Sequence, residues 1–191
     1  MSTRLVIVFC LLLLAPELWA GSNIISPTVA HTKWLDREYT IQGTTLRMED
    51  NVTAVGVSYR FLFDSGLAVG GDFLYSVDQD FRAASGGYTG YSTFWHLLAN
   101  VSYTFNRQGQ LQPFVEGGLG YSTLSLHSNG GPNASLEGLN LHGGAGLNYY
   151  VSDVIGFKFG AKVIDFDVRD GNGGRIDGRI AEYLFALNIR F

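Results

Sequence analysis

One short stretch of the chain places a potential nucleophile beside a potential base. His127 is followed directly by Ser128, and Glu137 is the next acidic residue along the chain. Hydrolysis by an activated serine requires the hydroxyl and the imidazole to lie within hydrogen-bond reach of each other. Adjacent residues of a strand point to opposite faces, so this pair fits the requirement poorly. We expect residues 127–133 to be a polar turn without catalytic chemistry.

Candidate metal ligands are also sparse. His96 and His142 are predicted to lie on different strands and could meet, but two histidines without a third ligand are a weak zinc signal. Asp165, Asp167 and Asp170 precede a Gly-rich segment, yet they lack the glycine and final glutamate of a twelve-residue calcium loop. The sequence therefore predicts no catalytic, cofactor or metal site.

The N-terminal segment has the pattern of a secretory signal. A nearly unbroken apolar run covers residues 5–14, and Leu18 with Ala20 offers an acceptable cleavage site before Gly21. Such a run is too short to cross a bilayer as a helix. We expect a signal peptide at residues 1–20 and a single mature domain at 21–191. The only cysteine, Cys10, lies in the expected signal, so we expect no disulfide in the mature chain.

Apolar and polar residues alternate along most of the mature chain, which is typical of strands with one apolar face. Three short turn signals lie roughly 44 residues apart, at 64–66, 106–109 and 152–153. Longer polar stretches near 79–90, 127–138 and 169–177 separate them. Short turns at one end and long loops at the other are typical of outer-membrane barrels. The predicted fold is all-β, an eight-stranded antiparallel up-and-down transmembrane β-barrel.

If the apolar parity faces lipid, the opposite parity places several charged side chains inside the barrel. An eight-stranded barrel has an interior just wide enough for side chains to fill. We therefore expect a structural salt-bridge network in the lumen, because buried charges need partners, and we regard a gated ion path as the minority hypothesis. The predicted network comprises Arg60, Asp72, Glu116, Lys158, Lys162, Glu182 and Arg190.

The C-terminal residues show the most regular alternation. Every second residue is large and apolar, and the apolar set is Tyr183, Phe185, Leu187, Ile189 and Phe191. A membrane sheet cannot leave an unpaired edge in lipid, so such a strand fits a barrel that closes there.

Other strands are less regular. The first strand is predicted at 38–48, with 23–34 as the alternative. Beyond Val163 the parity changes, which predicts either a β-bulge or a strand that leaves the membrane. Aromatic residues beside the short turns predict a periplasmic girdle, because aromatic rings favour the headgroup level. The predicted girdle comprises Tyr59, Phe61, Phe63, Tyr103, Phe105, Tyr149, Tyr150 and Phe191.

With these features, the chain resembles the small outer-membrane barrels of the OmpA, OmpX and Ail kind. The Gly-rich segments 113–121 and 142–147 are similar to strands of that superfamily. The resemblance implies a bacterial outer-membrane location, contact with lipid and lipopolysaccharide, and recognition of the terminal Phe191 motif by the barrel assembly machinery. It also implies a role in adhesion, surface protection or envelope integrity, exerted through the external loops toward a host or envelope partner.

We therefore expect a monomeric, non-enzymatic barrel, and two alternatives stay open. The first is a lipid A or phospholipid hydrolase on the same barrel, because residues 126–130 are similar to a His-x-Ser-Asn stretch of lipid A deacylases. The second is a soluble exported ligand-binding barrel, which would invert the parity and expose the charged set. The net charge of −4 and the scattered basic residues give no nucleic-acid patch.

Overall fold

The computed structural model describes residues 21–36, 38–41, 44–48, 51–76, 79–83, 89–129, 133–171 and 174–191. The expected signal peptide lies outside these residues. The described chain forms eleven strand segments and contains no helix long and apolar enough to cross a membrane. The segments are β1 (Gly21–Trp34), β2 (Glu38–Ile41), β3 (Thr44–Met48), β4 (Asn51–Phe63), β5 (Leu67–Ser76), β6 (Gln79–Ala83), β7 (Thr89–Thr104), β8 (Leu111–Asn129), β9 (Ala134–Tyr150), β10 (Ile155–Arg169) and β11 (Arg175–Arg190).

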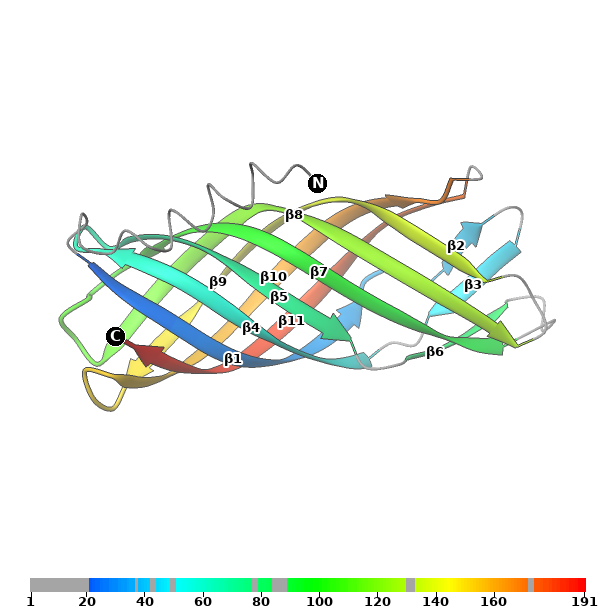
Figure 1. The fold of residues 1–191 in the computed structure, drawn as a ribbon. Helices are drawn as coiled ribbons and strands as arrows, with labels where there is room; N and C mark the ends of the chain where they lie inside the picture. Colours follow the sequence, from blue (N-terminus) through cyan, green and yellow to red (C-terminus); the bar gives the residue numbers. More distant parts are fainter. Residues whose placement is uncertain are drawn as a thin grey trace.

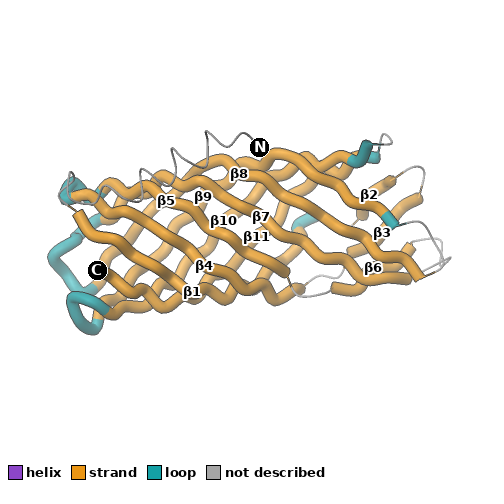
Figure 2. Tube along the Cα trace, in the orientation of Figure 1, coloured by secondary structure: helices purple, strands orange, loops and turns teal. Residues whose placement is uncertain are grey.

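Eight long strands close into an antiparallel barrel (Figures 1 and 2). Around the wall they follow the order β1, β4, β5, β7, β8, β9, β10 and β11, and the last strand pairs with the first. At this closure Val29 lies opposite Phe185, and the backbone groups of Phe191 and Asn23 exchange two hydrogen bonds of 2.9 Å. Closure leaves no unpaired edge in the part of the wall that faces lipid, as a membrane sheet requires.

Three short connections lie together at one end of the barrel. They join β4 to β5, β7 to β8 and β9 to β10 at the predicted turn positions. Gly66 has a φ of +91° in the first turn, a conformation that glycine adopts without steric cost. Short turns mark the periplasmic end of an outer-membrane barrel, so the opposite end is extracellular.

The first strand differs from the main prediction. The alternative segment forms β1, whereas 38–48 forms the short hairpin β2–β3, so the assignment of strand one to 38–48 was wrong. The cause is local: Ser26, Thr28 and Thr32 occupy the inward positions of β1, and these small polar residues weaken the hydrophobic signal of a lumen-facing strand.

The wall has a different set of strands at the extracellular end. The strands β1, β4 and β5 do not extend into this part of the wall. In their place, β2 pairs with β3, β3 pairs with β6, and β6 pairs with the extracellular end of β7 (Figure 1). Strand segments therefore occupy part of the stretch that was predicted to be a loop near 79–90. Similarly, β8 continues to Asn129 and β11 begins at Arg175, so all three predicted loops are shorter than expected.

The change of parity in β10 does not come from a bulge. Pairing with β11 is continuous from Ile155 opposite Ile189 to Arg169 opposite Arg175. Ile164, whose side chain is fully buried, points into the barrel, while Asp165 points outward. The strand keeps its register. Before this point its apolar residues face outward and its polar residues face the lumen, and beyond it the apolar residues face the lumen and the polar residues face outward. The bulge alternative is therefore wrong.

This exchange divides the barrel into two parts. In the spanning half, next to the short turns, the outer face is apolar, as at Val57 and Leu97, and the lumen is polar. In the extracellular half, the interior is an apolar core and the outer face is polar. This apolar core comprises Trp34, Tyr39, Leu46, Met48, Val52, Phe81, Phe94, Leu98, Leu124, Leu126, Leu136, Ile164, Phe166, Val168, Ile176 and Ile180.

Candidate functional site

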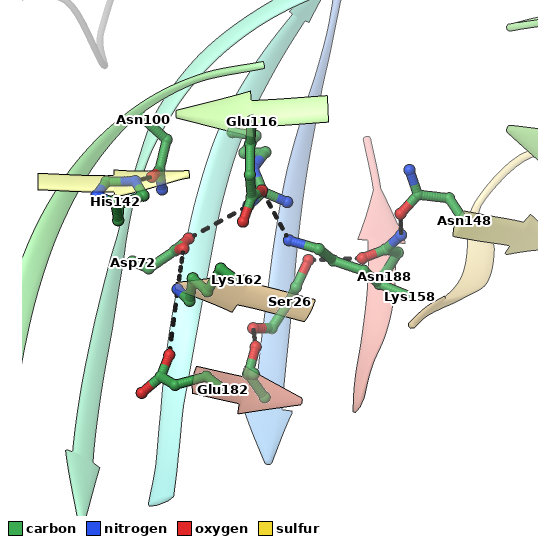
Figure 3. A network of polar contacts seen from close by, with 12 residues as sticks. Ser26, Asp72, Asn100, Glu116, His142, Asn148, Lys158, Lys162, Glu182 and Asn188 are labelled. Carbon is green, nitrogen blue, oxygen red and sulfur yellow. Dashed lines mark hydrogen bonds and ion pairs between the residues drawn. The ribbon is translucent and has the colours of Figure 1, made fainter. Parts of the chain in front are cut away.

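The lumen of the spanning half contains a compact ion-pair network. Lys162 lies 3.1 Å from Asp72 and 3.6 Å from Glu182 (Figure 3). On the side toward the short turns, Glu116 lies 2.7 Å from Arg60 and 3.2 Å from Lys158. Five different strands, β4, β5, β8, β10 and β11, supply these side chains, so the network ties distant parts of the wall together.

The network is balanced in charge. It joins three cations to three carboxylates, and Arg60 connects its two parts because it also lies 3.5 Å from Asp72. All six side chains are buried, and Arg60 is the most exposed at 10%. Buried charges are tolerated when they are paired and hydrogen-bonded. The ammonium of Lys158 also lies 4.7 Å from the ring centre of Phe114, which adds a cation–π contact.

Arg190 does not join this network. Its guanidinium lies 3.9 Å from the ring centre of Tyr150 and donates a hydrogen bond of 3.4 Å to Gln112. The ring of Tyr150 is therefore inside the barrel, where it is 5% exposed, and its assignment to the lipid-facing girdle was wrong. Arg190 and Tyr150 instead form part of a polar layer near the periplasmic mouth.

Buried polar side chains occupy the level between the ion pairs and the apolar core. His96 lies 3.4 Å from Glu182, and His142 forms a hydrogen bond with Asn100. Asn140 donates a hydrogen bond of 2.7 Å to Ser122. The two histidines thus have separate partners, and the described residues contain no group of three metal-ligating side chains.

The lumen contains a small cavity. A cavity of about 20 Å³ lies near the periplasmic mouth, beside Arg60, Gln112 and Asn188. This volume holds about one water molecule. Above the ion pairs, the apolar core fills the barrel, and the rings of Tyr39, Phe94 and Phe166 lie 5.6–5.7 Å from that of Trp34. The arrangement favours a filled barrel over an ion path.

The possible hydrolase residues do not converge. His127 faces outward and stacks on Tyr91, with ring centres 4.7 Å apart and planes 5° apart. Ser128 has the opposite parity, and its hydroxyl is buried without a hydrogen bond among the described residues. Glu137 accepts a hydrogen bond from Tyr121. The imidazole, hydroxyl and carboxylate therefore do not form a catalytic group.

Three acidic residues of the β10–β11 end, Asp165, Asp167 and Asp177, are paired with arginines, and Asp170 accepts a hydrogen bond from the backbone N–H of Gly174. Asp165 lies 3.3 Å from Arg179, and Asp167 lies within 3 Å of both Arg169 and Arg175. These contacts lie on the exposed outer face of the extracellular half. The hydrogen bond from Arg169 lowers the pKa of Asp167. Arginine partners occupy the oxygens that a calcium ion would need.

Tyr39 is the titratable member of the apolar core. Its side chain is 5% exposed, and its hydroxyl donates a hydrogen bond of 2.7 Å to the carbonyl of Asp36. Burial raises the pKa of Tyr39 well above its ordinary value, and the charge of Asp36 acts in the same direction. The phenol is therefore neutral at every physiological pH.

Aromatic side chains mark both levels where the outer face meets the headgroups. On the extracellular side, Trp95 lies between Phe73 and Tyr121, with ring centres 6.2 and 6.3 Å away. On the periplasmic side, Phe61 packs on Phe63 and Tyr103 packs on Phe105, each pair 4.9 Å apart. Two aromatic levels flanking an apolar band are characteristic of outer-membrane barrels.

The residues of the predicted assembly motif lie on the outer face of β11 and at its end. Tyr183 and Phe185 are 54% and 47% exposed, and Phe191 is 65% exposed. Their side chains are available to lipid or to an assembly partner. Recognition by the assembly machinery stays a prediction.

A closed eight-stranded sheet with an apolar outer band and a filled polar lumen defines a small transmembrane barrel of the bacterial outer membrane. The sequence matches the outer membrane protein beta-barrel domain family over residues 6–191, and the chain belongs to this family.

Solved structures agree with this assignment at the level of the fold. Neisserial surface protein A superposes with a TM-score of 0.66 at 13% identity, covering 90% of this chain and 99% of the other. OprG from Pseudomonas aeruginosa gives 0.67 at 16%, covering 91% and 97%. Ail from Yersinia pestis, solved with the heparin analogue sucrose octasulfate, gives 0.58 at 17%, covering 90% and 99%. No curated protein sequence matches the chain.

Sequence reasoning missed the apolar core of the extracellular half. The sequence indicates this core at Leu124, Leu126 and Ile164, which are apolar residues at inward-facing positions of their strands. All three are buried in the core. The apolar inward residues Phe94 and Leu98 lie on the same β7 face as the polar His96 and Asn100. This mixture concealed the boundary between the two halves.

Proposed function

We propose that the protein is a non-enzymatic, monomeric barrel that recognises a partner at the cell surface through its extracellular half. The observation that carries this proposal is the apolar core above the ion-pair network. A filled core adds nothing to transport but supports a rigid wall beyond the membrane, and β8 has 19 residues where about 9–11 suffice to cross a bilayer.

The polar outer face of this half is suited to recognition. Binding residues usually lie on loops and ends that a rigid scaffold positions. Four connections lie at this end, and they join β1 to β4, β5 to β7, β8 to β9 and β10 to β11. The strands that they join are held by the apolar core, so the ends of the connections are fixed in space. The described loops and strand ends offer hydrogen-bonding groups and a few exposed rings, such as Tyr91 at 41% exposure.

The experiment compares cells that express the full chain with empty-vector cells. We expect greater adhesion to surfaces coated with matrix glycoproteins and glycans, unchanged lipid A by mass spectrometry, and flat traces when the purified protein is added to planar bilayers. Stepwise conductance would indicate a channel, and altered lipid A would indicate the hydrolase alternative. Unchanged adhesion would contradict the recognition role.

A further inference from the structure

Two exposed arginines face each other directly on the outer surface of the extracellular half. Arg47 of β3 and Arg82 of β6 are cross-strand partners, and both point away from the apolar core because Leu46, Met48 and Phe81 point into it. Like charges at directly opposed positions are destabilising in a sheet. An anion that contacts both guanidinium groups would offset this repulsion.

No carboxylate of the described residues provides this compensation. Glu38 lies opposite Arg47, and Asp80 is two positions before Arg82, but neither forms an ion pair with an arginine within 4 Å. The arginines of β10 and β11 behave differently, since Arg169, Arg175 and Arg179 each have an aspartate partner. Within the described chain, the guanidinium groups of Arg47 and Arg82 are available to a ligand.

The same strands continue the surface with uncharged polar groups. Arg82 lies opposite Thr89 of β7, which in turn lies opposite Asn129 of β8, and these three side chains are exposed. A hydroxyl and an amide next to the cations can donate and accept hydrogen bonds. Figure 1 shows β3 and β6 beside the ends of β7 and β8 at the extracellular end, and the pairing of these strands places the row there.

An exposed aromatic ring and a cavity lie beside this row. In the next row, Asp80 lies opposite Tyr91, whose ring stacks on His127. A cavity of about 240 Å³ lies here, and Asp80, Arg82, Thr89 and Tyr91 are among the residues that line it. Arg82 is the cation of this lining and Asp80 is its carboxylate. An aromatic face next to hydrogen-bonding groups suits a ligand with an apolar side and a polar rim.

We propose that this surface, the Arg47–Arg82 site, binds an acidic saccharide. The two guanidinium groups would hold one carboxylate or sulfate, because a planar fork of donors matches paired oxygens of an anion. The sugar ring would lie against Tyr91, and its hydroxyls would meet Thr89 and Asn129. The site names a ligand class for the proposed recognition function and rests on that function for its biological meaning.

Binding is measured with the full chain in phosphatidylcholine nanodiscs, which contain no lipopolysaccharide. The probes are hyaluronan oligosaccharides, which carry carboxylates, dextran sulfate of similar length, uncharged dextran, and single-stranded DNA of matched charge. We expect an acidic saccharide to bind, dextran not to bind, and DNA to bind more weakly. The preference between hyaluronan and dextran sulfate identifies the anionic group.

Substitutions locate the site. Arg47→Gln and Arg82→Gln are each expected to weaken saccharide binding about tenfold, because each removes one charge-assisted contact. Tyr91→Ala is expected to weaken it without changing its salt dependence. The matched control is Arg175→Gln, which removes an exposed arginine that already has aspartate partners and should bind as wild type.

Three results would overturn the site. They are no binding of either acidic saccharide, binding by Arg47→Gln and Arg82→Gln as tight as by the wild type, and DNA binding as tight as saccharide binding. These results are distinct from failure of the proposed function. Cells that adhere while purified protein binds no acidic saccharide would refute only the site. Saccharide binding by cells that do not adhere would refute only the adhesive role.

Discussion

The ammonium of Lys162 lies 3.1 Å from the carboxylate of Asp72, although ninety positions separate the two residues in the sequence. The contact crosses the lumen from β10 to β5, strands that are not neighbours in the wall. Lys162 also contacts Glu182, which lies 3.4 Å from His96 and accepts a hydrogen bond of 3.4 Å from Thr32. This single cation therefore joins three strands.

Replacing Lys162 with methionine should strongly destabilise the barrel. Asp72 keeps Arg60, but Glu182 is left buried beside His96 and the hydroxyl of Thr32, without a lysine or arginine partner. Breaking a buried ion pair by removing one partner costs about 3–5 kcal/mol. Urea titration of the protein folded in lipid vesicles, followed by gel migration without boiling, measures the loss.

The control for Lys162→Met is Arg175→Gln. Arg175 is 53% exposed and pairs with Asp167 and Asp177 in water. Exposed ion pairs contribute roughly 0–1 kcal/mol. A Lys162 variant as stable as this control would show that the lumen charges are solvated and the network is not structural.

The two tryptophans of the expected mature chain report on the two halves of the barrel. Trp95 lies on the outer face, among the aromatic side chains on the extracellular side of the apolar band. Trp34 is 1% exposed and lies inside the apolar core. In vesicles containing brominated lipid, the Trp34→Phe variant, which retains Trp95, should be strongly quenched. The Trp95→Phe variant, which retains Trp34, should fluoresce nearly as in unbrominated vesicles.

Equal quenching of the two variants would contradict the assignment of the outer aromatic level. Unmodified lipid of the same chain length provides the control for each variant. Strong quenching of Trp34 alone would mean that the residues of the apolar core face lipid. The assignment of the inner and outer faces would then be reversed.

Much of the spanning half could be predicted from alternation alone. Successive residues of a strand point alternately to lipid and to the polar lumen. An apolar residue such as Phe157 is therefore predicted to face lipid, and a charged neighbour such as Lys158 is predicted to face the lumen. The inward charges were identified for the same reason. Their partners were not, because pairing across the lumen depends on shear and strand order, which bring Lys162 to Asp72 and leave Arg190 elsewhere.

The extracellular half was harder to predict. Its strands carry the soluble pattern, apolar inside and polar outside, on the same chain segments that carry the membrane pattern below. A parity rule applied to a whole strand then misreads one of the two parts. The short strands β2, β3 and β6 are held by pairing and by this core, and strands of four or five residues give little periodic signal of their own.

Tyr39 predicts a loss of stability at high pH. Its pKa is raised in the folded protein by burial, so the neutral phenol is favoured in the fold. The stabilising effect is complete below the ordinary tyrosine pKa of about 10 and declines as the pH rises above it. Urea titrations at increasing pH should show this decline, and Tyr39→Phe should remove part of it.

Ultraviolet titration of tyrosinate provides an independent measurement. The wild type should contain a component that ionises only at strongly alkaline pH or on unfolding, and this component should be smaller in Tyr39→Phe. Tyr75, on the outer face, supplies the control through Tyr75→Phe, which should leave the late component intact. A late component of unchanged size in Tyr39→Phe would show that Tyr39 does not contribute to it.

Phe191 combines two separable features. Its backbone N–H and C=O bond to Asn23 and complete the β1–β11 closure, whereas its ring is exposed and forms the end of the predicted assembly motif. Phe191→Ala keeps the two backbone hydrogen bonds and removes the ring, and deletion of Phe191 removes the hydrogen bonds as well as the ring.

In cells, the substitution and the deletion should each deplete the protein from the outer membrane, as measured by heat-modifiable migration of membrane fractions. Refolded in detergent without other proteins, Phe191→Ala should match the wild type, and only the deletion should lose stability. Normal assembly of Phe191→Ala in cells would show that the ring is not part of an assembly signal.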